Sequence, residues 1–237
     1  MAGIASSRWA RWVGLASRRA DRRDVGPDTP VAGGDVDPDT PLFEVPFAVV
    51  DVETTGGSPA TAVLTEVAAA RYRGGECVGT LQTLVDPGCA VPPLISSLTG
   101  ITDDMVHGAP PVSSVLPSLL EFVHGAVIVG HNVSFDVSFL NAALACDGRD
   151  PLGNTTVDTL ALARRLVRPD VPNCRLRTLA GALHLEHAPT HRALDDVRAT
   201  ADLLHLLIER ATGHGVFVLG DLIGLTSEPA LRPARVS

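Results

Sequence analysis

The sequence predicts an α/β fold in which a mixed or parallel sheet is flanked by helices. Two short apolar runs, residues 46–50 and 126–130, have the length and composition of wholly buried strands. Residues 112–123 and 137–143 carry apolar side chains at helical spacing. Buried strands that alternate with amphipathic helices are typical of open α/β sheets, whose sites lie at the carboxyl ends of the strands.

Length and composition are those of a single globular domain with tails. The chain has 237 residues, of which 45% are hydrophobic, enough to bury one sizeable core. No apolar run approaches the roughly 20 residues that span a bilayer, so we expect a soluble protein that makes no membrane contact. The formal charge of -8 argues against a protein that coats nucleic acid, but not against a nuclease whose bound cations screen phosphates. The four cysteines form no C-x-x-C pair, which predicts reduced, mostly buried thiols in a cytoplasmic protein rather than a zinc site or a disulfide framework.

We expect three segments along the chain. Residues 1–44 are predicted to be a disordered extension, arginine-rich at first and then acidic and rich in proline and glycine. The arginine-rich part has two alternative interpretations, a basic amphipathic helix that contacts nucleic acid or a membrane surface, and a transit-like leader. Residues 45–212 form the predicted domain, and residues 213–237 a short C-terminal tail without room for a second active site.

Asp51 and Glu53 stand at the end of the first buried strand. Successive side chains of a strand point to opposite faces, so these two share one face, about 6–7 Å apart along the backbone. Two carboxylates in this position repel each other unless a cation lies between them, although two solvated acids at a strand edge are the alternative. Residues 62–72 and 78–85 then read as strands joined by a glycine turn, which predicts an antiparallel continuation of the first strand.

A third carboxylate follows the second buried strand. Asp136 falls in the first turn of the next predicted helix, on the same side of the sheet as the first two acids. An ordinary first-turn aspartate, stabilised by the helix dipole, is the alternative. Residues 157–166 and 175–183 are predicted to form two further helices.

The last predicted helix starts near Pro189 and Thr190 and continues to about Glu209. Five residues of helix rotate by about 140°. His191 and Asp196 therefore converge only if His191 lies at or just before the helix start, which is where the start signals place it.

These motifs together resemble the DEDDh, or DnaQ-like, 3'–5' exonucleases, the family that includes the proofreading epsilon subunit of bacterial DNA polymerase III. The matching segments occur in the family's order and lie within residues 46–210; they are residues 50–56, 98–102, 131–136 and 191–196. The resemblance implies an RNase H-like fold, a mixed five-stranded sheet flanked by helices.

The resemblance also implies hydrolysis of terminal phosphodiester bonds of DNA at single-stranded or frayed 3' ends, releasing nucleoside 5'-monophosphates in proofreading or repair. Two divalent cations about 4 Å apart, Mg²⁺ or Mn²⁺, would be held by carboxylates. By resemblance Asp51, Glu53 and Asp196 hold the metal that activates water, and Asp51 and Asp136 reach the second. His191 is the implied general base, because an unperturbed histidine pKa of about 6.5 lies near operating pH. The family spacing leaves the neighbouring Asp195 as a helix-start charge.

Substrate contacts follow from the same resemblance. The residues implied around the 3'-terminal nucleotide are Thr54, Thr55, Thr99, Asn132 and Phe135. Leu94 stands where many relatives carry a glutamate that touches the terminal sugar, so the resemblance does not carry that contact to this chain. Six arginines near the last motif are candidates to follow the phosphate backbone, with solvated helix faces as the alternative: Arg164, Arg165, Arg168, Arg175, Arg177 and Arg192.

The expected partner is a nucleic acid 3' end, with DNA favoured, and the protein is expected to work alone or beside a DNA polymerase or repair complex. Two alternatives stay open, an exoribonuclease on short RNA and a non-catalytic module whose tails bind a polymerase or repair partner. The intact acids and histidine argue against the module, since binding alone does not need five convergent polar groups. The sequence does not indicate the oligomeric state.

Overall fold

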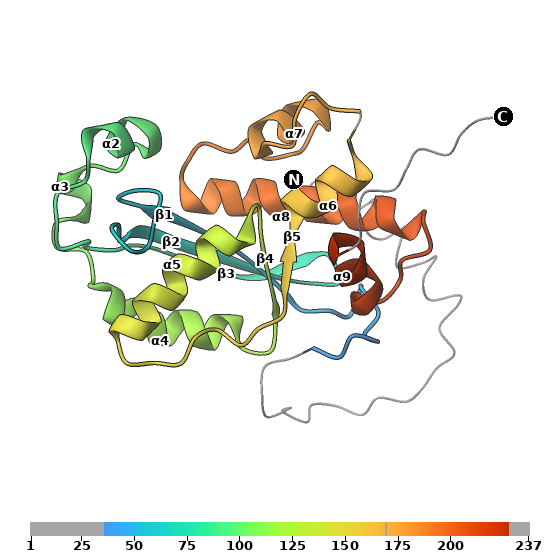
Figure 1. The fold of residues 1–237 in the computed structure, drawn as a ribbon, viewed down its shortest axis with the longest axis horizontal. Helices are drawn as coiled ribbons and strands as arrows, with labels where there is room; N and C mark the ends of the chain where they lie inside the picture. Colours follow the sequence, from blue (N-terminus) through green and yellow to red (C-terminus); the bar gives the residue numbers. More distant parts are fainter. Residues whose placement is uncertain (1–35, 169, 228–237) are drawn as a thin grey trace.

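The computed structural model describes residues 36–168 and 170–227, which form one five-stranded sheet with helices on both faces (Figure 1). The strand order is β3-β2-β1-β4-β5. β1 pairs antiparallel with β2 and parallel with β4, β2 and β3 are antiparallel, and β4 and β5 are parallel. The strands are β1 (Phe47–Thr54), β2 (Leu64–Arg73), β3 (Glu76–Leu84), β4 (Val127–Gly130) and β5 (Thr156–Asp158). The predicted mixed five-stranded sheet flanked by helices is confirmed.

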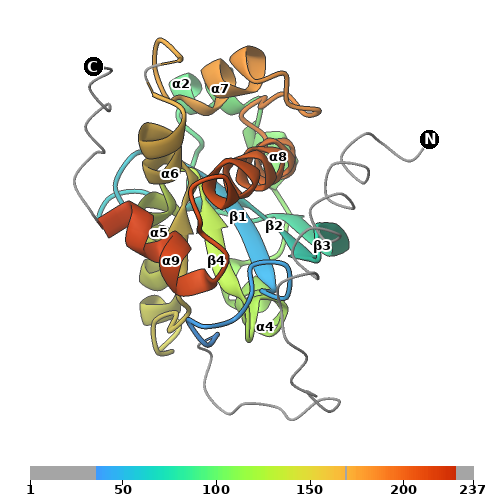
Figure 2. The same cartoon turned by 90° about the vertical axis from the view of Figure 1, so that its right-hand side faces the viewer.

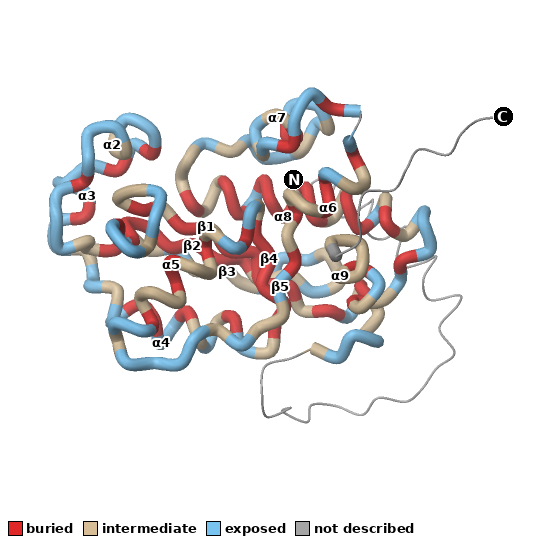
Figure 3. Tube along the Cα trace, viewed as in Figure 1, coloured by how far each residue is buried: buried red, intermediate tan, exposed pale blue. Residues whose placement is uncertain are grey.

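The helices divide between the two faces of the sheet. α8 lies over β1 and β2, with α6, α7 and α9 on the same side, while α4 and α5 cover the other face (Figure 2). The helices are α2 (Pro93–Thr99), α3 (Asp103–Val106), α4 (Val112–Val123), α5 (Val133–Cys146), α6 (Thr159–Leu166), α7 (Leu176–Ala182), α8 (Ala193–Thr212) and α9 (Leu219–Ser227). Buried residues concentrate in the sheet and on the inner faces of these helices (Figure 3).

β1 supplies side chains to both cores because strand side chains alternate. Val49 belongs to the core under α6 and α8, and Val50 belongs to the core under α4 and α5. Asp51 and Glu53 have the same parity as Val49, so they face α8. The strand continues through both acids, which pair with Ala68 and Glu66 of β2. The sheet therefore directs both carboxylates toward the helix that carries the last sequence motif.

The prediction of one helix over residues 157–166 is wrong at its start. Val157 is buried in β5, where it pairs with Val129 of β4. Asp158 ends the strand and its side chain accepts a hydrogen bond of 2.8 Å from the Leu160 N–H, so it caps α6. A three-residue strand is too short to show a period of two, and the helix that follows hid it.

Segments on both sides of residues 45–212 pack on the same core. Leu42 is fully buried, and its N–H donates to the Phe217 carbonyl at 3.0 Å. Leu219 of α9 is also fully buried, and its N–H donates to the Thr40 carbonyl at 3.0 Å. The packed core thus extends beyond the predicted domain at both ends, because the end of the N-terminal extension and the start of the C-terminal tail bury apolar side chains in the same cluster. The predictions for residues 1–35 and 228–237 lie outside the described residues.

Within the described parts of the chain, no helix is both long and apolar enough to cross a membrane.

The prediction of mostly buried cysteines is wrong. Cys174 is buried, whereas Cys77, Cys89 and Cys146 are exposed, because they lie on edge strand β3, in a loop and at the end of α5.

Leu42→Ala should lower the free energy of unfolding by about 2–5 kcal/mol, because it leaves a cavity in a closed core. Leu94→Ala is the matched control. Leu94 is 79% exposed, so its truncation should change stability by less than about 0.5 kcal/mol. Urea unfolding measures both variants, and equal small losses would show that the segment before β1 does not contribute to the core.

Candidate active site

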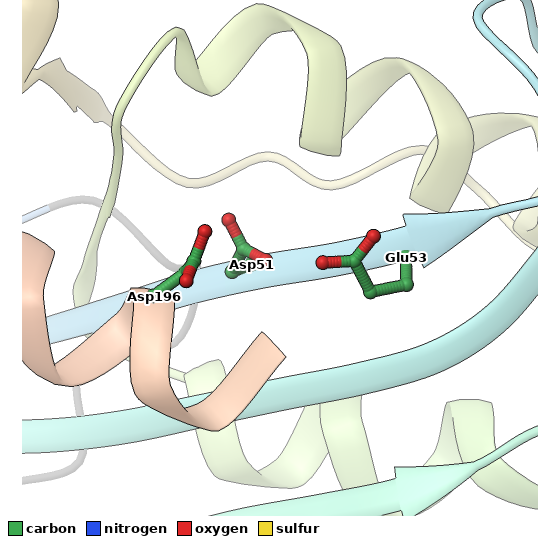
Figure 4. A group of neighbouring side chains, drawn as sticks. All are labelled: Asp51, Glu53 and Asp196. Carbon is green, nitrogen blue, oxygen red and sulfur yellow. The ribbon is translucent and has the colours of Figure 1, made fainter. Parts of the chain in front are cut away.

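Three carboxylates meet between β1 and α8. Asp51 and Glu53 come from the strand and Asp196 from the first turn of the helix, and all three point into the same space (Figure 4). One carboxylate oxygen from each lies within 4.8 Å of the others. Asp196 is buried, and the other two are half-buried. Converging carboxylate oxygens are the ligands that hard divalent cations prefer.

Burial and mutual repulsion disfavour the charged forms of these acids. Burial raises the pKa of Asp51 well above its usual range, and the charges of Asp136 and Asp196 raise it further. The pKa of Glu53 is raised to about 8, by burial first and then by the Asp196 charge. Burial also raises the pKa of Asp196, against two backbone hydrogen bonds that lower it. A bound cation would compensate this repulsion and displace protons from the cluster.

Asp136 lies beside the three-carboxylate group rather than within it. It is buried in the first turn of α5, as predicted, and its Oδ1 accepts a hydrogen bond of 3.1 Å from the Val52 N–H. Val52 stands between Asp51 and Glu53 in β1, so this bond holds the fourth acid against the strand. Burial raises the pKa of Asp136 to about 7.

His191 lies just before α8, where the sequence placed it. Its φ of 62° is in the left-handed region, which turns the chain sharply at this point. The N–H groups of His191 and Thr190 donate to Asp196 Oδ1 at 3.2 and 2.8 Å. These two bonds tie the histidine loop to the carboxylate of the next helical turn.

A buried ion pair joins the start of α8 to β2. The Glu66 carboxylate is almost fully buried and accepts two hydrogen bonds from the Arg192 guanidinium, at 2.9 and 3.1 Å. It also accepts from the Ala193 N–H at 3.1 Å and from Gln82 at 2.9 Å. Burial by itself would raise the pKa of Glu66, but these hydrogen bonds outweigh it and hold the pKa below its usual value. Arg192 is therefore bound within the protein rather than free to follow a phosphate backbone.

Two residues outside the predicted site anchor the loops that carry it. Glu66 is the only acid of β2 and directly precedes the apolar run of residues 67–70. A buried acid needs hydrogen-bonding partners, so this position was the sequence signal that could have found it. Asp158 follows one buried residue of β5, and its Oδ1 also accepts from the Asn132 N–H at 3.0 Å. Neither Glu66 nor Asp158 belongs to the four sequence motifs, yet each hydrogen-bonds to a segment that contains a motif.

The hydroxyl groups of the three predicted threonines form local hydrogen bonds. Thr54 donates to the Gly56 carbonyl at 2.7 Å, and the Thr55 hydroxyl accepts from the Val63 N–H at 3.0 Å. Thr99 is buried, donates to the Ile95 carbonyl and accepts from the Ile101 N–H. These contacts shape the loops after β1 and α2, and the substrate role of the threonines stays a prediction.

Asn132 and Phe135 lie at the start of α5. Asn132 has a left-handed φ of 75° at the turn between β4 and the helix. Phe135 is half-buried and packs on Phe139, with the ring centroids 4.9 Å apart. Leu94, on α2, is one of the most exposed large apolar side chains of the described residues. The substrate roles of Asn132 and Phe135 also stay predictions.

Glu66→Ala should destabilise the protein by about 1–3 kcal/mol, because it leaves the Arg192 guanidinium and the Ala193 N–H without their acceptor. Thermal or urea unfolding measures the loss. The exposed Glu121 of α4 supplies the control, and Glu121→Ala should change stability by less than about 0.5 kcal/mol. Stability losses below about 0.5 kcal/mol in both variants would show that the Glu66–Arg192 ion pair does not stabilise the packing of α8 on the sheet.

Glu53→Gln should raise the melting temperature of the metal-free protein, and by more at about pH 8 than at about pH 5. The folded-state pKa of about 8 lies above the ordinary value of 4.5. Below pH 4.5 the Glu53 carboxyl is protonated in both the folded and the unfolded protein and costs no stability. The cost grows as pH rises and is complete once pH passes through 8, whereas glutamine stays neutral throughout. Differential scanning calorimetry in a chelator checks this, with the exposed Glu76→Gln as control. A difference in melting temperature between Glu53→Gln and wild type that narrows with rising pH would contradict the prediction.

Comparison with known proteins identifies the family. The family model RNase_T, described as an exonuclease, matches residues 48–204. The chain is 45% identical over 190 residues to a putative bifunctional exonuclease/endonuclease protein of Mycobacterium tuberculosis, covering 76% of this chain and 29% of the relative. It is 40% identical over 186 residues to a PolC-type DNA polymerase III of Oceanobacillus iheyensis, covering 78% of this chain and 13% of the polymerase. The chain thus spans less than a third of these relatives.

Solved structures share the fold. E. coli exonuclease I in complex with a dT13 oligonucleotide superposes with a TM-score of 0.65 at 24% identity, over 73% of this chain and 43% of that one. Exonuclease I from Methylocaldum szegediense gives 0.63 at 26% identity, over 71% of this chain and 41% of that one. The predicted RNase H-like arrangement is confirmed. The family model, together with the PolC-type relatives, shows that the chain belongs to the DEDDh, DnaQ-like exonuclease family.

Proposed function

We propose that this chain is a 3'–5' exonuclease that hydrolyses terminal phosphodiester bonds of DNA and releases nucleoside 5'-monophosphates. The observation that carries the proposal is the convergence of Asp51, Glu53 and Asp196 within 4.8 Å, in a member of an exonuclease family. Four acids with raised pKa values around one strand end are costly to the fold, and such acids cluster at functional sites.

The donor set fits divalent cations. Three carboxylates offer hard oxygen ligands at one point. Asp136 of α5 is hydrogen-bonded through Oδ1 to Val52, the residue between Asp51 and Glu53, and this bond leaves its Oδ2 for a cation. We propose that Asp51, Glu53 and Asp196 hold one Mg²⁺ or Mn²⁺ ion and that Asp51 and Asp136 hold a second. When bound, such ions lower the pKa of water and stabilise the attacking and leaving oxygens of a phosphoryl displacement.

His191 is the proposed general base. Its backbone N–H is bonded to Asp196, so its half-buried imidazole is carried beside the cluster by a loop of fixed geometry. One imidazole nitrogen would take the proton of the attacking water as the phosphodiester bond breaks. In contrast to the acids, the histidine is not a proposed metal ligand.

DNA is the proposed substrate because the polymerase relatives are DNA polymerases, and the role would be proofreading or repair at single-stranded or frayed 3' ends. The terminal nucleotide would contact the predicted residues after β1, in α2 and at the start of α5. We further propose that the protein acts in the cytoplasm, alone or beside a DNA polymerase or repair complex.

Variants separate the base from the ligands. His191→Ala should lower the hydrolysis rate of a 3'-labelled oligonucleotide by about 10²–10⁴-fold, the usual contribution of a positioned base. Its Mn²⁺ affinity by calorimetry should stay near wild type. Asp196→Asn should lose both activity and metal binding, whereas Asp195→Asn, on the exposed side of the same helical turn, should keep both.

Each role has its contradicting result. Near wild-type turnover of Asp196→Asn at saturating Mg²⁺ would exclude its carboxylate as a ligand. Loss of Mn²⁺ binding in His191→Ala as complete as in Asp196→Asn would replace the general base by a metal ligand. Faster hydrolysis of short RNA than of DNA by the wild type would assign the exoribonuclease alternative instead.

A further inference from the structure

A cavity of about 700 Å³ lies beside the carboxylate cluster, where α6, the connection to α7 and the loop before α8 meet. His191 and Asp196 form one side of it, so it is continuous with the candidate active site. Its volume is within the range of about 300–1,000 Å³ that is usual for ligand pockets. Four exposed arginines also line it: Arg164, Arg168, Arg175 and Arg177.

The positive charges of these arginines are not neutralised locally. Among residues 36–168 and 170–227, no carboxylate forms an ion pair with any of the four guanidinium groups. This differs from Arg192, which the Glu66 carboxylate occupies. Guanidinium groups without a carboxylate partner are suited to bind phosphate oxygens, in a chain whose formal charge is -8.

Hydrogen bonds fix the connection between α6 and α7, which carries Arg168 and Arg175, to its neighbours. His131 Nε2 lies 2.8 Å from the Cys174 carbonyl oxygen, which only accepts, so Nε2 carries the hydrogen and donates it. His131 Nδ1 lies 3.0 Å from the Thr159 hydroxyl at the start of α6. Cys174 is buried, and the Arg175 N–H is bonded to Asn173 Oδ1 at 3.0 Å. The start of α7 is thereby fixed relative to β4 and α6, which makes the cavity a built feature.

The lining is suited to a backbone rather than to bases. Apart from the four arginines, His131, His191 and Asp196, it consists of small, apolar or neutral side chains: Leu160, Pro172, Asn173, Cys174, Leu176 and Pro189. Among the described residues that line it there is no Phe, Tyr or Trp, the large rings on which bases most often stack. None of the five residues predicted to surround the terminal nucleotide lines it either. It therefore accommodates a part of the substrate other than that nucleotide.

We propose that this cavity binds the phosphates of a single-stranded polynucleotide on the 5' side of the bond that is cleaved. The inference rests on the proposed function, because the scissile phosphate at the carboxylate cluster defines where the strand enters. Arginines that contact only phosphates bind every sequence alike and hold a polymer more tightly than a mononucleotide. The cavity is thus the element that distinguishes a strand from its product.

The first test is equilibrium binding. Fluorescence anisotropy measures a short oligo-dT with Ca²⁺ in place of Mg²⁺, between about 50 and 200 mM salt. Arg175→Gln/Arg177→Gln should bind more weakly, and the slope of log K against log salt should shrink by about 0.7 for each phosphate that the variant no longer neutralises. The control, Arg73→Gln/Arg149→Gln, removes equal charge at the far end of β2 and beyond the C-terminal end of α5, and it should keep the slope.

The second test compares two substrates. Thymidine 5'-monophosphate p-nitrophenyl ester has a cleavable phosphodiester but carries no phosphate on the 5' side of the bond that is cleaved. The loss of kcat/KM in Arg175→Gln/Arg177→Gln should be about 10-fold greater for the oligonucleotide than for the ester. Arg164→Gln/Arg168→Gln, on α6 and just after it, provides a second variant that leaves the α7 connection intact.

The outcomes are distinguishable. An unchanged salt slope, or equal losses on both substrates in both arginine pairs, would overturn the phosphate-binding role. A wild type that hydrolyses neither substrate would overturn the proposed exonuclease function, while the anisotropy slopes would still decide whether the cavity binds a strand.

Discussion

The Glu66–Arg192 ion pair determines where α8 begins, and the candidate active site depends on it. Asp196 approaches two acids of β1 to within 4.8 Å, an arrangement that charge repulsion opposes. The buried Glu66 carboxylate holds both Arg192 and the first N–H of the helix, and it stands directly opposite Glu53 in the sheet. One buried acid with its partners satisfied therefore positions acids that repel one another.

Local patterns predicted what local physics determines. The alternation of β1 placed Asp51 and Glu53 on one face, and the helix-start residues placed His191 ahead of α8, since both depend only on chain neighbours. The strand β5 was not predicted because its three residues are too few to show the alternation of side chains that marks a strand. The packing of Leu42 against α9 and the Glu66–Arg192 pair were missed because the partners lie far apart in sequence, 126 residues in the second case.

The site and the cavity carry side chains of opposite charge, which reconciles the acidic composition of the chain with the proposed polyanionic substrate. Under the proposed function, bound cations would offset the negative charge of the acids where the scissile phosphate lies, so metal binding and substrate binding would be coupled at the strand end. The proposed arginine cavity attracts the strand without cations. His191 and Asp196 belong to the candidate active site and also line the cavity. The loop between Pro189 and α8 therefore lies between the acidic cluster and the arginines.

A time course on a single-stranded DNA oligonucleotide labelled at both ends tests the central claim most directly. With Mg²⁺, the 3' label should appear at once in a nucleoside 5'-monophosphate, while the 5'-labelled strand shortens stepwise, and a chelator should stop both. Release of the 5' label as the first mononucleotide, internal cleavage without shortening, or hydrolysis that continues in the chelator would contradict a metal-dependent 3'–5' exonuclease.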